Sequence, residues 1–178
     1  MMARSRVWFC AAADALFLVS CGRAEKKTQA FAALFSEPFS LQGTLNYEEN
    51  VLAVSVLHGA EKTVLTLTDG ALAGCGFALE KRDDGTEQLK AFCEDVQMPF
   101  AAQDGILQLF SALTPTAEEL LPHADGFESA GGVRYTVQKD GTPRTVQCAE
   151  LTLRIEAFEQ AAPDGPETAA KETEYDGA

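Results

Sequence analysis

The sequence predicts an α+β fold: a curved, mainly antiparallel β-sheet of about seven strands with helices on its concave face. Three observations support this class. Apolar residues alternate with polar ones in several successive segments, which is the period of half-buried strands. Short turn-forming stretches join most of these segments, so neighbouring strands are expected to be antiparallel. One mid-chain segment has the apolar spacing of a helix and needs a sheet face to cover.

The N-terminal segment has the features of an export signal. Arg4 and Arg6 precede an apolar stretch of about 13 residues, which is short for a membrane-spanning helix but sufficient for a secretory signal. Leu18-Val19-Ser20-Cys21 follows and resembles the bacterial lipobox, in which the cysteine is acylated and the signal is removed just before it. An ordinary cleaved signal and a buried N-terminal helix are the alternatives.

The lipobox resemblance implies a lipidated protein. Residues 1–20 would be a signal peptide, Cys21 the lipidation site and residues 21–27 a lipidated tether. The mature chain would then be anchored in the cell membrane, on its extracytoplasmic face, through acyl chains on its first residue.

The folded domain is predicted over residues 28–159. It begins with a helix over residues 28–35, because Phe31, Leu34 and Phe35 lie at helical spacing. The period then changes to two, which predicts three strands, at residues 39–46, 51–58 and 63–68.

The next two strands form a hairpin whose register the sequence defines. Asp83-Asp84-Gly85 is typical of a three-residue loop, a type I turn followed by glycine in the left-handed conformation. This loop places Lys81 opposite Glu87 and Cys75 opposite Cys93. In an exported domain these cysteines can form a cross-strand disulfide; the alternative is that they pack as two small buried thiols.

The chain between residues 100 and 122 is predicted to be helical. Ile106, Leu109, Phe110 and Leu113 share one helix face, and a capping box at residues 116–119 predicts a second, short helix.

A loop is expected from residue 123 to 132, followed by the last two strands. These strands are predicted at residues 133–139 and 144–158, the second with a β-bulge near residues 149–150 because its apolar parity changes there. Residues 160–178 are acidic and lack large aliphatic residues, which predicts a disordered tail.

Composition and motifs exclude several functions. Lys and Arg number 14 against 27 Asp and Glu, and the resulting net charge of −13 disfavours nucleic-acid binding. The two histidines, His58 and His123, are far apart and form no helical zinc motif. No nucleophile elbow or phosphate-binding loop occurs. We therefore expect no enzymatic activity, no metal and no cofactor.

The order of elements from about Phe31 to Phe158 resembles that of the LolA/LppX superfamily of envelope lipoprotein carriers and lipid-binding lipoproteins. The similarity lies in the strand meander of residues 39–68, the join at residues 70–74, the mid-chain helices and the turn at residues 140–144. It implies an unclosed half-barrel that binds or shuttles acyl chains in its concavity.

Six apolar residues are candidates for lining such a cavity, because they are expected on the hairpin and on the mid-chain helix. They are Phe77, Leu79, Leu89, Ile106, Leu109 and Phe110. The expected partner is a lipid or another hydrophobic ligand. The alternative is that these residues fill a solid core, which would make the domain a structural or protein-interaction module of the cell envelope.

Overall fold

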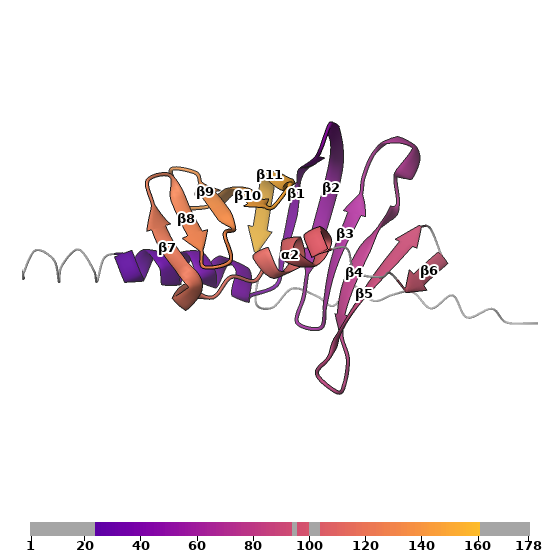
Figure 1. Cartoon of the computed structure of the whole chain (residues 1–178), viewed down its shortest axis with the longest axis horizontal. Helices are drawn as coiled ribbons and strands as arrows, with labels where there is room; N and C mark the ends of the chain where they lie inside the picture. The colour runs from indigo at the N-terminus through magenta and orange to yellow at the C-terminus, as the bar shows by residue number, and fades with distance from the viewer. Residues whose placement is uncertain (1–23, 94–95, 100–103, 161–178) are drawn as a thin grey trace, which may run out of the picture.

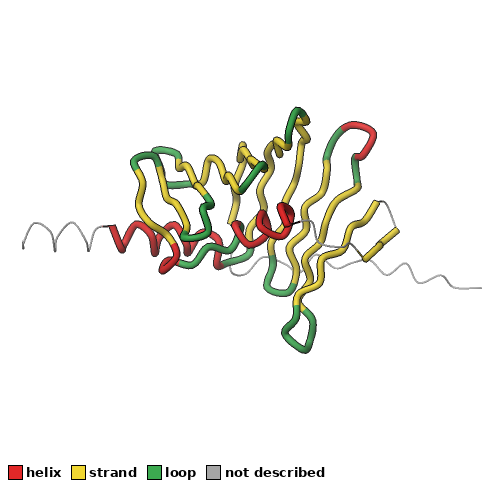
Figure 2. Tube along the Cα trace, viewed as in Figure 1, coloured by secondary structure: helices red, strands yellow, loops and turns green. Residues whose placement is uncertain are grey.

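The computed structural model describes residues 24–93, 96–99 and 104–160, and β-strands dominate them (Figures 1 and 2). The strands are β1 (Phe39–Tyr47), β2 (Asn50–His58), β3 (Lys62–Leu67), β4 (Cys75–Lys81), β5 (Glu87–Cys93), β6 (Val96–Pro99), β7 (Leu120–His123), β8 (Gly126–Ser129), β9 (Arg134–Val137), β10 (Pro143–Cys148) and β11 (Leu151–Gln160). They form one sheet in the order β6-β5-β4-β3-β2-β1-β11-β10-β9-β8-β7. All the pairings are antiparallel.

The fold class predicted from the sequence, an α+β half-barrel of about seven strands with helices on the concave face, is wrong. The described chain forms a single large sheet of eleven strands, which is not closed, and it has only two α-helices. Three of the strands that the sequence missed, β6, β7 and β8, have four residues each. Segments this short show too little alternation to be recognised as strands.

The long strand predicted at residues 144–158 is two strands. Cys148 pairs with Leu151, and Ala149 has a φ of 47°, so residues 149–150 form a two-residue hairpin turn between β10 and β11. At a β-bulge and at a two-residue turn alike, the buried positions change from even to odd residue numbers. The apolar pattern therefore predicts a bulge here, although the chain forms a turn. The predicted second helix is likewise only a 3-10 turn, η2 (Ala117–Glu119), before β7.

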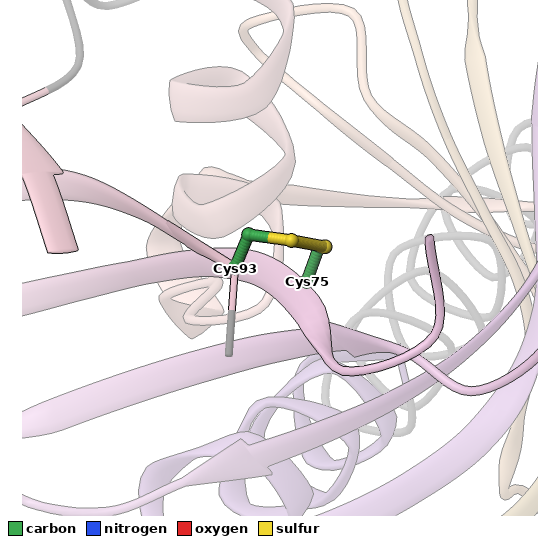
Figure 3. Close-up of a disulfide and its surroundings, with 2 residues drawn as sticks. All are labelled: Cys75 and Cys93. Atoms are coloured by element: carbon green, nitrogen blue, oxygen red, sulfur yellow. A yellow bond between two sulfur atoms is a disulfide. The ribbon is translucent and has the colours of Figure 1, made fainter. Parts of the chain in front are cut away.

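The predicted register of the β4–β5 hairpin is confirmed. Lys81 pairs with Glu87 and Cys75 with Cys93. The Arg82 backbone N–H donates to the Thr86 carbonyl oxygen at 2.8 Å across the loop, and Gly85 has the expected positive φ of 81°. Of the two alternatives for the cysteines, the structure contains the disulfide (Figure 3).

The two helices share one hydrophobic core with the sheet. The N-terminal helix covers residues 24–36, and so includes the last four residues of the expected tether. Its Phe31 ring packs on Phe127 of β8 and Tyr135 of β9. The other helix, α2 (Asp104–Ala112), contacts β10, and the Tyr135 hydroxyl donates to the Ala112 carbonyl oxygen at 3.0 Å.

Several predictions concern residues outside the described part of the chain. These are the signal peptide at residues 1–20, the lipidation site Cys21 and the tail beyond Gln160, which is itself the last residue of β11. Within the described residues, neither helix has the length and apolar character needed to cross a membrane.

Candidate ligand cavity

A cavity of about 740 Å³ lies between the first four strands and the start of α2. Its volume is within the range of about 300–1,000 Å³ that is typical of small-molecule sites. The described residues that line it are Leu45, Tyr47, Leu52, Leu65, Leu67, Leu72, Phe77, Gly105, Ile106, Ala149, Glu150 and Leu151. Nearly all of these are apolar, and Glu150 is the only charged residue among them.

Cross-strand pairs form the floor of this cavity. Leu45 of β1 pairs with Leu52 of β2, and Leu65 of β3 pairs with Phe77 of β4. Directly opposed residues in an antiparallel sheet point to the same face, so the alternation of each strand brings these four side chains together. Leu52 and Phe77 are only half-buried. The apolar floor is therefore incompletely covered by the rest of the protein.

The wall of the cavity comes from the first turn of α2 and from β11. Gly105 and Ile106 both line the cavity. A Cβ atom placed on Gly105 would lie 3.4 Å from Cδ1 of Leu151, so the helix backbone rests directly on the start of β11. This close approach sets the distance between helix and sheet at this end of the cavity.

Two large apolar side chains at the cavity are open to solvent. Tyr47 is 41% exposed and Leu72 is 55% exposed, although most residues of their size and type are buried in this protein. Exposed apolar side chains that border an apolar cavity are typical of a ligand-binding groove.

Two glutamates influence the ionisation of Tyr47, the exposed lining residue at what we call the mouth of the cavity. Glu48 raises the pKa of the Tyr47 hydroxyl above its ordinary value, mainly through its negative charge, and Glu150 contributes in the same direction. Both carboxylates thus act on a side chain that lines the cavity. No lysine or arginine is present among the described lining residues.

The structure places the six predicted cavity residues in three different environments. Phe77 and Ile106 line the cavity described above. Leu79 and Phe110 instead line a separate and more polar cavity of about 470 Å³ near His58. Leu89 and Leu109 line neither cavity and are 7% and 0% exposed; like Phe110, which is 2% exposed, they belong to the hydrophobic core.

Sequence reasoning missed most of the lining residues, in particular Tyr47, Leu52, Leu72 and Leu151. The signal for two of them was present, because the alternation of the first two strands places Leu45, Tyr47 and Leu52 on one face. The contribution of Leu151 could not be predicted, because the turn that precedes it was interpreted as a bulge.

Among the described residues, the two histidines and the free cysteine form no second candidate site. His58 Nδ1 lies 2.7 Å from the Thr63 hydroxyl oxygen, and burial lowers its pKa. His123 Nδ1 lies 3.2 Å from an Asp125 carboxylate oxygen. Burial raises the pKa of the Cys148 thiol to about 11, which keeps it protonated near neutral pH. No group of three or more His, Cys, Asp or Glu in this part of the chain is arranged to hold a metal ion.

Comparison with known proteins identifies no relative: no protein-family model matches the chain, and no curated protein matches it. The functional argument therefore depends on the residues of the chain itself.

Proposed function

We propose that the protein is an extracytoplasmic lipoprotein, anchored in the membrane by its N-terminal lipid, that binds or carries a lipid or another hydrophobic ligand. The observation that carries the proposal is the apolar cavity of about 740 Å³, with its exposed Tyr47 and Leu72. A structural module with a filled core, the alternative from the sequence, has less support because this cavity is present.

The physical basis of binding would be the burial of hydrocarbon. Each methylene group transferred from water into an apolar site contributes about 0.8 kcal/mol. A long alkyl or acyl chain gains most from a site with this lining. Binding would also cover the half-buried floor residues Leu52 and Phe77, which water otherwise contacts.

The membrane anchor is supported by the sequence Leu18-Val19-Ser20-Cys21. We expect cells that express the chain and are fed radioactive palmitate to incorporate label into it, and Cys21→Ser to abolish the incorporation, because the thiol is the acylated group. Cys148→Ser is the matched control and should remain labelled. Absence of label from the unaltered chain would contradict the anchor but not the ligand cavity.

Filling the cavity should prevent binding. We expect Ile106→Trp to weaken the binding of a neutral solvatochromic dye such as Nile red by about tenfold or more, because the indole occupies space that the ligand needs. The measurement is a fluorescence titration of the purified protein.

Leu121→Trp is the matched control for this experiment. Leu121 lies on β7, is 63% exposed and lines none of the described cavities, so dye affinity should remain unchanged. Circular dichroism establishes that both variants fold. Equal affinities for the two variants, or no dye binding by the unaltered protein, would contradict the proposed function.

A further inference from the structure

The charge at the mouth of the cavity comes from two adjacent hairpin turns. Tyr47 pairs with Asn50, so Glu48 and Glu49 form the two-residue turn between β1 and β2. Residues 149–150 form the corresponding turn between β10 and β11. Because Tyr47 also pairs with Leu151, both turns lie at the same end of the sheet, beside Tyr47.

This arrangement places carboxylates beside Tyr47, at the mouth of the cavity. Glu150 itself lines the cavity, and Glu48 is adjacent to Tyr47 in the chain. Neither Glu48 nor Glu150 forms an ion pair within the described residues. Their charges are therefore not neutralised by a lysine or arginine of the described chain.

We infer that the cavity selects single-chain amphiphiles that carry an ammonium headgroup over those that carry a carboxylate. This inference rests on the proposed function, because it concerns the ligand of the same cavity. The hydrocarbon chain would lie on the apolar floor between the sheet and α2, and the ammonium group would lie at the mouth beside Glu48 and Glu150.

Two interactions favour an ammonium group there. Opposite charges attract each other more strongly at a protein surface than in bulk water, because the effective dielectric constant there is lower. Aromatic rings such as that of Tyr47 also attract cations to their faces. A carboxylate or phosphate headgroup at the same place would be repelled by both glutamates and would find no basic partner among the described lining residues.

The test compares three ligands that share one chain and differ in headgroup: hexadecylamine, hexadecanol and palmitic acid. Each is used to displace Nile red from the purified protein near neutral pH, below its critical micelle concentration. We expect the amine to displace the dye at a concentration about tenfold lower than the acid, with the alcohol between them.

Two double variants of equal net charge distinguish the effect of the glutamates at the cavity mouth from the effect of the protein's overall charge. Glu48→Gln combined with Glu150→Gln should bring the amine and the acid to within about twofold of each other, because both of the charges that act on Tyr47 are removed. Glu156→Gln combined with Glu159→Gln removes the same charge from β11, at residues that line none of the described cavities, and should keep the tenfold preference.

The possible outcomes distinguish this inference from the proposed function. Equal displacement by all three ligands, or a preference for the acid, would overturn the headgroup selection and leave hydrophobic binding standing. A preference that survives in the Glu48/Glu150 variant, or that disappears in the Glu156/Glu159 variant, would also overturn it. Failure of every ligand and of the dye to bind would overturn the proposed function itself.

Discussion

Replacing Phe31 by alanine is expected to lower the free energy of unfolding by about 3–5 kcal/mol, the usual cost of removing a buried phenylalanine side chain. Phe31 is 2% exposed. Its ring is stacked on that of Phe127 at a centroid distance of 4.6 Å. It also packs against the ring of Tyr135 in a T-shaped arrangement, with a centroid distance of 5.4 Å. The truncation leaves a cavity between the N-terminal helix and the β8–β9 hairpin. Urea denaturation measures the resulting decrease in the free energy of unfolding.

The matched control for Phe31→Ala is Gln29→Ala in the same helix. Gln29 is exposed, so its replacement should change stability by no more than about 0.5 kcal/mol. If Phe31→Ala costs less than about 1 kcal/mol, the helix does not depend on this aromatic contact, and its docking on β8 and β9 is contradicted.

The sequence predicted best those features that local chemistry determines. The Asp83-Asp84-Gly85 loop fixed the register of β4 and β5 because a three-residue turn defines which residues face each other. The helix α2 was found for a similar reason: several apolar residues recur at helical spacing over a sufficient length.

The number of strands and the cavity depended on information that a local pattern lacks. β6, β7 and β8 are stabilised by pairing with neighbours, and their four residues carry almost no periodic signal. The lining of the cavity depends on where α2 rests on the sheet, which Gly105 and Leu151 determine through a contact between residues far apart in the chain. The alternation of the strands can thus predict the residues of the cavity floor, but it cannot predict those of the wall.

At the junction between β1 and β11, the addition of a single methyl group is expected to lower the free energy of unfolding substantially. This pair joins the strands β1–β6 to the strands β7–β11, and its register shifts between Gln42 and Gly43. A Cβ atom on Gly43 would lie 2.0 Å from the backbone oxygen of Arg154 and 3.2 Å from Cα of Ile155. Neither of these backbone atoms can move away without disturbing the pairing of the two strands.

Gly43→Ala is therefore expected to lower the free energy of unfolding by about 3 kcal/mol, at the upper end of the usual cost of overpacking, because backbone must shift and not a flexible side chain. Gly59→Ala is the matched control: its Cβ atom would have only an ordinary contact, 3.6 Å from the backbone oxygen of Lys62. That variant should stay within about 0.5 kcal/mol of the unaltered protein in urea denaturation. Equal stabilities of the two variants would mean that β1 and β11 are not as close as the structure places them, and the continuity of the eleven-stranded sheet would then be in error.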